Sequence, residues 1–368
     1  MNPASTSWLW GVGTIGSHVA AHLARTPAVV RVTLVDPDVY DASNLRGQSI
    51  GAADVGRKKV HVQARRLRSI DRGLAVATWD EVVESMPRGQ LRADVILACL
   101  DSRRARQSVN ELAFVLGVPW IDAGVSSEAH LARVDVYHPG KRNPCLECAW
   151  DDRDYAALEQ LYPCLAGGLG GGEPAPTNAS SSLGALAASL QMIECEKLIS
   201  RSALAADGGT QVLIDVGRHK HYVTRFRRNP RCRLPSHESL TVEPLSTTAR
   251  DLTLSETFGL ARLRREASEV HVAGKSFIRG FTCMGCARTR DAFQLVVDAV
   301  RPLCRLCRHP MRAAGLDTVD RVELRTLPAK WLGRNLASLG FRAGEIVTVG
   351  DARQQRHFEL GGTRNDSR

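Results

Sequence analysis

The sequence predicts an α/β protein with a doubly wound parallel sheet, and three observations support that prediction. A glycine-rich turn at 11–16 separates a short apolar strand from an apolar-periodic helix at 17–23. A second strand follows at 30–35, and a third apolar strand occupies 93–100. Strands that alternate with helices in this way build a parallel sheet with helices on both faces. Ligands of such sheets bind outside the carboxyl ends of the strands.

The glycine turn reads G-x-G-x-x-G and stands between a strand and a helix, as a nucleotide site requires. Gly11 makes the tight turn, Gly13 lets the backbone approach a phosphate, and Gly16 lets the helix pack on the strand. Asp36 ends the second strand and is placed to bind a ribose hydroxyl. The pattern predicts a Rossmann-like nucleotide site for either a dinucleotide or a nucleoside triphosphate.

A polar run after the second strand favours the triphosphate. It contains Asn44, Arg46 and Gln48, and Lys59 follows it. Several phosphate charges require cations and amides close together, whereas a nicotinamide cofactor does not. Asp101 follows the third strand at the carboxyl edge of the sheet, where a carboxylate can hold Mg²⁺ on the phosphates.

The composition indicates a soluble globular protein of two or three units within 368 residues. Hydrophobic residues make up 43%, and no apolar run reaches the length of a membrane span. The glycine turn opens too early to leave room for a signal peptide. We therefore expect a cytoplasmic protein whose ten cysteines serve metal or thiol chemistry. We interpret the net charge of +10 as a solvated basic surface, in preference to a site for an acidic partner or for nucleic acid.

Two cysteine patterns predict zinc sites. The first joins Cys145 and Cys148, a C-x-x-C at a turn, to a distant pair, Cys232 and His237. Tetrahedral zinc needs four such ligands, here on two loops. The second pattern is a pair of C-x-x-C knuckles with seventeen residues between them, which is typical of a zinc ribbon. Its ligands are Cys283, Cys286, Cys304 and Cys307.

Further elements extend the sheet beyond its parallel part. A strand at 118–124 continues it, and a strand at 131–138 begins an antiparallel extension. A crossover loop rich in glycine and proline, 150–179, leads into an amphipathic helix at 182–199. Two more strands are expected, at 212–216 and 222–226.

The chain divides into four parts by this interpretation. Residues 1–240 form the nucleotide-binding domain, and 241–275 form a connector with one helix near 254–264. The zinc ribbon, 276–315, is too small to bury a sizeable core, so metal binding supplies its folding free energy. We expect it to dock a partner, with nucleic-acid contact as the second choice. The tail, 316–368, is β-rich and predicts a hairpin.

Several motifs, in order, resemble the adenylating family of ubiquitin-activating enzymes and their bacterial relatives ThiF and MoeB. They are D-P-D-x(5)-N-L at 36–45, G-x-x-K ending at Lys59, the strand-end Asp101, and G-x(4)-S-L-Q-x-x-E-x-x-K at 184–197. The likeness runs from about residue 8 to residue 237. It implies the adenylation-domain fold, ATP and Mg²⁺ as cofactors, a structural zinc in which His237 replaces a cysteine, and a homodimer.

The resemblance also assigns roles by position. Lys59 meets the phosphates and Asp101 holds the metal ion. The family usually reads N-L-x-R-Q, so the arginine position holds Gly47 here, and Arg46 is expected to supply the charge from one residue earlier. The implied cofactor-binding residues are Gly11, Gly13, Gly16, Asp36, Asn44, Gln48, Lys59 and Asp101. Arg106 and Asn110 also fall on family positions.

The implied activity is ATP-dependent adenylation of the C-terminal carboxylate of a small ubiquitin-like or sulfur-carrier protein. In many members a loop cysteine then takes the acyl group as a thioester, and Cys164 stands at that place. The expected catalytic residues are thus Cys164, Asp101, Lys59 and Arg46. A conjugating enzyme would be a further partner.

Three alternatives remain. The chain could adenylate a peptide or small carboxylate without a thioester, or it could be a non-catalytic nucleotide-binding adaptor that works through its ribbon. A nicotinamide oxidoreductase shares the glycine turn, but it leaves Lys59, Asp101 and the cysteine pairs unexplained.

Overall fold

The computed structural model describes residues 5–160, 179–234, 236–262, 269–296, 302–313, 318–351 and 353–362. The chain forms two compact units, described separately below. The N-terminal unit comprises Met1–Val83 and Arg92–Ser239, and the C-terminal unit comprises Glu84–Leu91 and Leu240–Arg368. Among the described residues no helix combines the length and the apolar character that crossing a bilayer requires.

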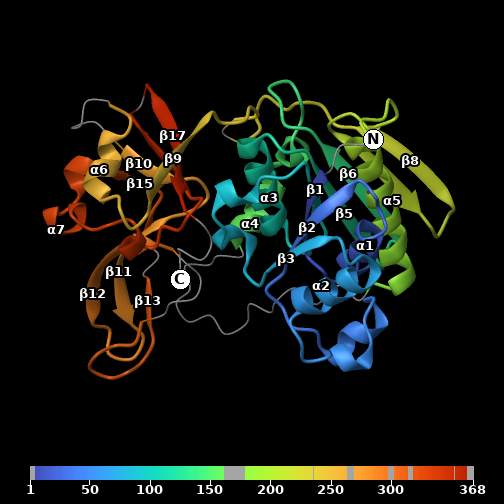
Figure 1. The fold of residues 1–368 in the computed structure, drawn as a ribbon, viewed down its shortest axis with the longest axis horizontal. Coiled ribbons are helices and arrows are strands. Elements are labelled where there is room, and N and C mark those ends of the chain that lie inside the picture. The colour runs from blue at the N-terminus through green and yellow to red at the C-terminus, as the bar shows by residue number, and fades with distance from the viewer. Residues whose placement is uncertain are drawn as a thin grey trace. The chain divides into compact units, whose positions relative to one another are not determined.

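An eight-stranded sheet forms the centre of the N-terminal unit, in the order β3-β2-β1-β4-β5-β6-β7-β8 (Figure 1). The parallel strands are β1 (Ser5–Trp10), β2 (Val29–Val35), β3 (Ala75–Trp79), β4 (Val95–Ala98) and β5 (Trp120–Ser126). The antiparallel strands are β6 (Leu131–Tyr137), β7 (Thr210–Asp215) and β8 (Lys220–Arg225). The predicted doubly wound sheet with an antiparallel extension is confirmed.

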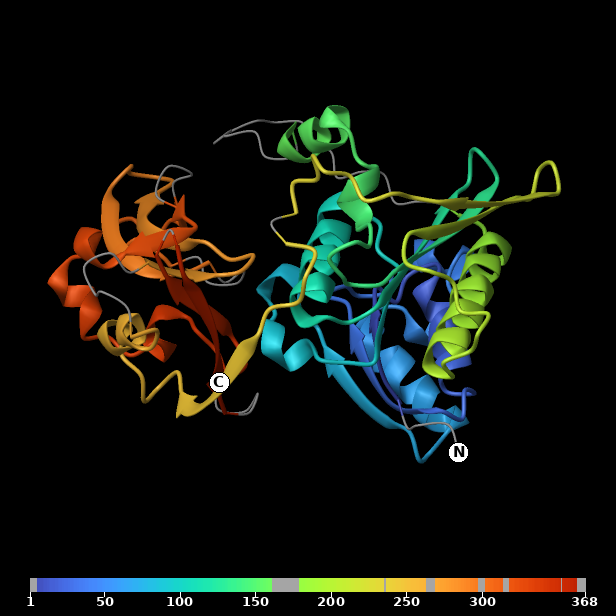
Figure 2. The same ribbon diagram turned by 90° about the horizontal axis from the view of Figure 1, so that it is seen from above.

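Helices cover both faces of this sheet (Figures 1 and 2). On one face α1 packs against α2 and α5, and α3 contacts β4 and β5 from the other. Burial on two sides explains why β4 is a continuous apolar run rather than an alternating one. The helices are α1 (Gly16–Leu23), α2 (Lys59–Ile70), α3 (Arg103–Leu116), α4 (Asp152–Gln160) and α5 (Ser181–Ile199).

One strand and two helices of this unit were not predicted: β3, α2 and α4. The apolar stripe of α2 consists of Val60, Ala64 and Leu67, which are buried among charged neighbours that dilute the pattern. The expected crossover loop contains α4 at its start, and its remainder, 161–178, lies outside the described residues.

A five-stranded sheet organises the C-terminal unit, in the order β15-β10-β16-β17-β9. The expected hairpin is the antiparallel pair β16–β17, which the rest of this sheet supports. The segment 241–275, expected as a connector, instead supplies β9, α6 and β10, because its apolar side chains, including Leu254, Phe258 and Val270, belong to the core. The elements are β9 (Val242–Thr248), α6 (Leu254–Gly259), β10 (Glu269–Val272), β15 (Arg321–Glu323), α7 (Ala329–Leu332), β16 (Ile346–Gly350) and β17 (Gln355–Gly361).

The ribbon has its own small sheet within this unit. Strand β11 lies between β12 and β13, and β14 also pairs with β11. Its apolar cluster contains only a few side chains beside the cysteines, as expected for a module that metal binding folds. The strands are β11 (Phe277–Cys283), β12 (Thr289–Leu295), β13 (Met311–Ala313) and β14 (Thr318–Val319).

A buried ion pair fastens the segment Glu84–Leu91 into the C-terminal unit. Lys275 Nζ lies 2.5 Å from Glu345 Oε1 and donates to the carbonyl oxygen of Ser85 at 2.8 Å. The Lys275 and Glu345 side chains are 4% and 0% exposed. Burial lowers the pKa of Lys275, and Glu345 opposes that shift. The Lys275 ammonium, which Glu345 stabilises, therefore holds the segment together with Arg342, which also donates to the carbonyl oxygen of Ser85.

We predict that Lys275→Met destabilises the C-terminal unit by about 3–5 kcal/mol, because it leaves the buried Glu345 carboxylate with the more distant Arg342, whose Nε lies 4.0 Å from Oε1, as its cation. Lys330→Met removes an exposed pair with Asp291 and should cost about 1 kcal/mol or less. Urea unfolding measures both losses. Hydrogen exchange should also accelerate in 84–91 for Lys275→Met alone, and equal losses in the two variants would show that the buried pair is not the anchor.

Candidate functional site

The glycine turn at the end of β1 contains two glycines that the backbone packing requires and one position, Gly13, where a larger residue would fit. Gly11 has a φ of +82°, and a Cβ there would lie 2.5 Å from the carbonyl oxygen of Cys99. A Cβ on Gly16 would lie 1.8 Å from the carbonyl oxygen of Gly11. A Cβ on Gly13 would meet nothing closer than Gln48 Nε2 at 3.9 Å. The open side at Gly13 is where a phosphate can approach the backbone.

Asp36, at the end of β2, holds this turn in place. Its carboxylate is buried and accepts the backbone N–H of Val12 at 2.8 Å and that of Asp38 at 2.9 Å. Burial raises the pKa of Asp36, whereas Lys59 and the two amides act to lower it. Each carboxylate oxygen has further lone pairs, so a ribose contact stays a prediction.

Lys59 opens α2 and is buried beside two carboxylates. Its Nζ lies 2.8 Å from Asp38 Oδ2. Burial alone would lower the pKa of Lys59, but Asp36 and Asp38 outweigh it, with a smaller contribution from Asp101, and the net pKa is raised. The ammonium therefore stays charged at neutral pH. The structure thus brings together three residues that the sequence singled out, Asp36, Lys59 and Asp101.

Tyr40 is a residue of this site that sequence reasoning missed. Its hydroxyl donates to the carbonyl oxygen of Val12 at 2.8 Å and accepts from Gln63 Nε2 at 2.8 Å. The side chain is 1% exposed, so it joins the glycine turn to α2 through a buried polar link. An aromatic residue within the polar run was the available signal.

The side-chain amide of Gln48 lies near Gly13, since its Nε2 would be 3.9 Å from a Cβ at that position. Its Oε1 is buried and has no hydrogen-bond partner within the described residues. A buried unpaired acceptor usually has a ligand or a water as its partner. Asn44 has a different role, because its Oδ1 accepts the N–H of Asp41 and closes the capping box of the short helix η1 (Ala42–Arg46).

Gly47 occupies the place of the arginine that the family usually carries. A Cβ at this position would lie 2.9 Å from the carbonyl oxygen of Ala179. Backbone packing therefore explains the glycine. Arg46, the expected substitute, is exposed at the end of η1, and its role stays a prediction.

Asp101 lies after β4, with an exposed side chain, and Ser102 behind it caps α3 by accepting the N–H of Ala105. In α3, Arg106 Nε donates to Asp122 Oδ1 at 3.0 Å. Arg133 donates to the other oxygen of Asp122 at 2.7 Å. Asp122 is fully buried, so this carboxylate is shared by two cations and fixes α3 against β5 and β6.

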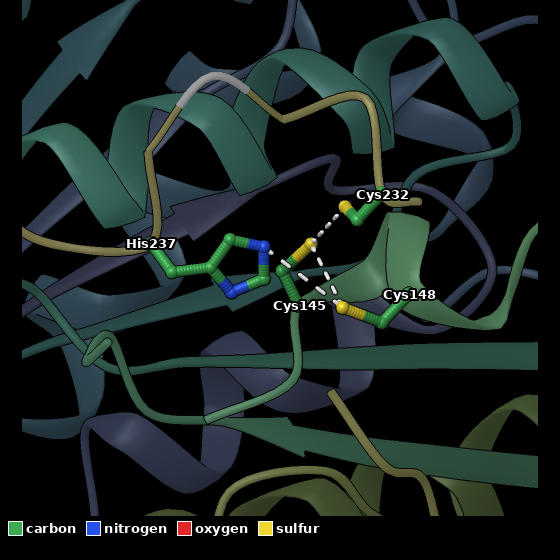
Figure 3. Close-up of side chains that lie close together, drawn as sticks. All are labelled: Cys145, Cys148, Cys232 and His237. Carbon is green, nitrogen blue, oxygen red and sulfur yellow. Dashed lines mark hydrogen bonds between the residues drawn. The ribbon is translucent and has the colours of Figure 1, made fainter. Parts of the chain in front are cut away.

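The first predicted metal cluster is assembled (Figure 3). The four side chains Cys145, Cys148, Cys232 and His237 point towards one another, and their ligand atoms all lie within 4.8 Å of each other. Cys145 Sγ lies 3.5 Å from Cys232 Sγ and 3.9 Å from Cys148 Sγ. With Zn–S bonds of about 2.3 Å, sulfur atoms of a tetrahedral site lie about 3.8 Å apart. The spacing therefore fits zinc.

His237 is oriented as a metal ligand. Its Nε2 lies 3.9 Å from Cys148 Sγ, while Nδ1 lies 2.8 Å from the carbonyl oxygen of Asn143. Such a second contact fixes the ring and its tautomer. The imidazole is 3% exposed and stands edge-to-face with Phe114. Asn110, from α3, accepts the N–H of Leu146 at 3.0 Å and so holds the first knuckle.

The second cluster lies in the ribbon and consists of Cys283, Cys286, Cys304 and Cys307. Cys283 Sγ lies 3.3 Å from Cys307 Sγ, and Cys286 Sγ lies 3.7 Å from Cys304 Sγ. The N–H groups of Gly285 and Cys286 point at Cys283 Sγ at 3.4 and 3.5 Å, which suits a thiolate. Four thiol ligands within one small module fit a structural zinc.

Residues 4–234 match the sequence profile of the ThiF family. The chain belongs to the ThiF family. Among similar proteins, the sulfur carrier protein ThiS adenylyltransferase of Escherichia coli (strain K12) is 29% identical over 145 residues, which cover 39% of this chain and 57% of that protein. The adenylyltransferase and sulfurtransferase MOCS3 of Sus scrofa is 31% identical over 162 residues, covering 43% and 34%.

The ubiquitin-like modifier-activating enzyme 5 of Mus musculus is 27% identical over 153 residues, covering 38% of each chain. This ThiF-family chain thus matches between 34% and 57% of these relatives' own length. The solved structure of E. coli MccB with ATP has a TM-score of 0.51 at 21% identity and covers 62% of this chain and 65% of that one. At that identity it shows the shared fold.

The cysteine expected as the nucleophile of this ThiF-family chain, Cys164, lies outside the described residues. Two other described cysteines do not belong to a metal cluster, Cys99 and Cys195. Burial raises the pKa of the Cys99 thiol, and it raises the pKa of Cys195 to about 12. Neither is therefore a reactive thiolate at neutral pH.

We predict that Gly16→Ala lowers the stability of the protein, whereas Gly13→Ala weakens its binding of ATP. Gly16→Ala forces backbone atoms apart and should lower the stability of the N-terminal unit by about 2 kcal/mol or more. Gly13→Ala should leave the melting temperature unchanged but weaken ATP binding about tenfold or more, because its methyl group fills the phosphate approach. Thermal unfolding and equilibrium ATP titration measure the two effects. Unchanged ATP affinity in a folded Gly13→Ala protein would show that no phosphate of ATP binds against the backbone at Gly13.

Proposed function

We propose that the chain is an ATP-dependent adenylyltransferase that activates the C-terminal carboxylate of a ubiquitin-like protein, a sulfur-carrier protein or a peptide. The observation that carries the proposal is the buried Lys59 ammonium, which lies 2.8 Å from Asp38 Oδ2 and whose pKa is also raised by Asp36 and Asp101. A dinucleotide site gives no reason to bury a lysine there. A triphosphate needs that charge.

The reaction would proceed by in-line displacement. A carboxylate oxygen of the substrate attacks the α-phosphorus of ATP, the bond from that phosphorus to the bridging oxygen breaks, and pyrophosphate leaves with the electron pair. An acyl adenylate remains. Lys59 and the amides of the glycine turn meet the phosphate charge, and the contribution of the site is positioning and charge neutralisation.

Asp101 is the residue that would hold Mg²⁺ in this scheme. Its carboxylate is exposed beyond β4, at the carboxyl edge of the sheet, and its oxygens are the ligand type that Mg²⁺ prefers. When bound to the phosphates, the ion supplies charge neutralisation of the leaving pyrophosphate.

The names of the relatives support this substrate class. Their names include an adenylyltransferase for the sulfur carrier protein ThiS and an activating enzyme for ubiquitin-like modifiers, and MccB has been solved with the peptide MccA. We favour a small carrier protein, with Cys164 taking the acyl group as a thioester after adenylation. The inert environments of Cys99 and Cys195 support Cys164, and a peptide substrate without a thioester is the second candidate.

A non-catalytic adaptor is the competing class. It would bind nucleotide without exchanging pyrophosphate, and the glycine at position 47 would mark a dead site. The contact between Gly47 and Ala179 argues against that interpretation, since it explains the glycine by packing. Dimerisation, a cytoplasmic location and a conjugating-enzyme partner remain predictions from sequence.

The decisive assay is ATP–pyrophosphate exchange in the presence of a small protein or peptide with a free C-terminal carboxylate. Lys59→Ala and Asp101→Ala should each reduce exchange by about 10²-fold, as expected for loss of a charge-stabilising group. Cys164→Ala should leave exchange unchanged, because its step follows adenylation. The same substrate with an amidated C-terminus is the control and should give none.

Exchange that survives in both Lys59→Ala and Asp101→Ala would move the chemistry to another site. ATP binding without exchange, for every free carboxylate tested, would favour the adaptor.

We propose that each cluster binds one zinc ion. The sulfur spacings fit tetrahedral coordination, in which the bound metal deprotonates the thiols and is neutralised by the thiolates. The ribbon zinc would stabilise a local module, whereas the other joins residues 145–148 to 232–237. Its loss should therefore affect the whole N-terminal unit.

Elemental analysis of the purified chain should find two zinc ions. His237→Ala should lower the content towards one and lower the melting temperature, whereas His237→Cys should retain both ions, because a thiolate replaces the imidazole as ligand. His221→Ala, which changes an exposed histidine on β8 outside both clusters, is the matched control. A full complement of two ions in His237→Ala would show that His237 is not a ligand.

A further inference from the structure

The ribbon exposes three large aliphatic side chains at its metal knuckles. Met284, in the first knuckle, is 46% exposed; Leu306, in the second, is 63% exposed, and Leu303 beside it is 50% exposed. The aromatic rings of the ribbon are in contrast buried, with Phe277 and Phe281 at 0% and 3%. Three of the four large apolar side chains exposed in the described ribbon thus lie at its metal end, and the fourth, Val296 after β12, is 36% exposed.

The two knuckles lie next to each other in space. The N–H of Met284 donates to the carbonyl oxygen of Pro310 at 3.2 Å, and Pro310 forms a bridge with Leu303. His309 packs so close to Gly285 that a Cβ there would lie 2.7 Å from the imidazole. We call residues 284–288, 303 and 305–310 the knuckle surface. Because these segments adjoin, its apolar side chains form one surface rather than scattered singles.

Arginines surround these apolar side chains. Arg305 precedes Leu306, Arg308 follows Cys307, and Arg288 closes the first knuckle, all of them exposed. None of the three has an ion-pair partner among the residues that the structure describes. The described ribbon, 277–296 and 302–313, contains six arginines and one aspartate. It stays cationic even with a zinc ion and four thiolates, which together carry two negative charges.

An acidic polypeptide fits this surface better than a nucleic acid does. Single-stranded nucleic acids bind by stacking bases on exposed aromatic rings beside cations. The knuckle surface offers aliphatic side chains instead, with no aromatic ring beyond the imidazole of His309. Aliphatic contacts with a cationic rim suit a peptide in which acidic residues accompany leucine-like ones.

We propose that the knuckle surface binds an acidic segment with aliphatic side chains in the protein or peptide whose carboxylate the chain activates. This inference rests on the proposed function for the identity of the partner. The family match ends at residue 234, so the ribbon lies outside the part that the carboxylate chemistry needs. A second contact on the same substrate raises its effective concentration at the reacting end.

The binding test uses the full zinc-loaded chain and a fluorescein-labelled synthetic peptide of glutamates interspersed with leucines. We expect fluorescence anisotropy to show binding that weakens with salt, since exposed charges are screened. Two double variants probe the two halves of the surface, Met284→Ser with Leu306→Ser and Arg305→Glu with Arg308→Glu. Each should weaken binding about tenfold or more, as for loss of central or charged contacts.

Two exposed residues outside the ribbon supply matched controls. Leu204→Ser removes a leucine that is 78% exposed, and Arg353→Glu reverses an exposed arginine in the β16–β17 turn. Both should leave the affinity unchanged. Zinc content, measured for every variant, separates loss of contact from loss of fold. If the peptide does not bind, or if the ribbon variants bind as tightly as the controls, the proposal is wrong.

A single-stranded RNA of similar length is the competing probe. Tighter binding of the RNA than of the acidic peptide, lost in Arg305→Glu with Arg308→Glu, would overturn the proposal in favour of nucleic acid.

Exchange kinetics connect the knuckle surface to the activated substrate. With a carboxylate substrate that contains an acidic segment, the ribbon variants should raise the KM for that substrate in pyrophosphate exchange and leave kcat unchanged. Absence of exchange would count against the proposed function, whereas the peptide titration would still show whether the knuckle surface binds an acidic segment.

Discussion

The pairing of the buried Asp36 carboxylate with the N–H of Val12 is the constraint on which the nucleotide site depends. It fixes the glycine turn to the end of β2, and Tyr40 fixes the same residue through its carbonyl oxygen. Lys59, whose Nζ pairs with Asp38 Oδ2 at 2.8 Å, is also stabilised as an ammonium by Asp36, and the two carboxylates keep this cation at the carboxyl edge of the sheet. The cation that stabilises the fold is thus also available to a phosphate.

Features with local signatures could be predicted from the sequence. The glycine turn, the strand-end carboxylates and the C-x-x-C spacings are short patterns whose geometry follows from a few neighbouring residues. His237 could be found because it follows Cys232 at a ligand-like distance and the family supplied an unfilled fourth position. The glycine turn follows β1, Asp36 follows β2, and the two groups of metal-ligand side chains are assembled.

Features that depend on distant contacts could not be predicted. The Asp122 carboxylate receives Arg106 from α3 and Arg133 from β6, and nothing in the sequence links those positions. The segment 84–91 joins the C-terminal unit through Lys275 and Glu345, both far away in the chain. For the same reason the residues after 241 were expected to form a connector: the partners of β9 and β10 in the sheet lie about 50 to 115 residues later in the chain.

Equilibrium titration of the purified chain with ATP and with NAD tests the central claim most directly. The account predicts that ATP binds, that Mg²⁺ strengthens its binding, and that Asp101→Ala removes the strengthening without unfolding the protein. NAD should bind far more weakly, because it lacks the phosphate charge that Lys59 meets. NAD binding as tight as that of ATP, or ATP binding that Mg²⁺ and Lys59→Ala leave unchanged, would contradict the account.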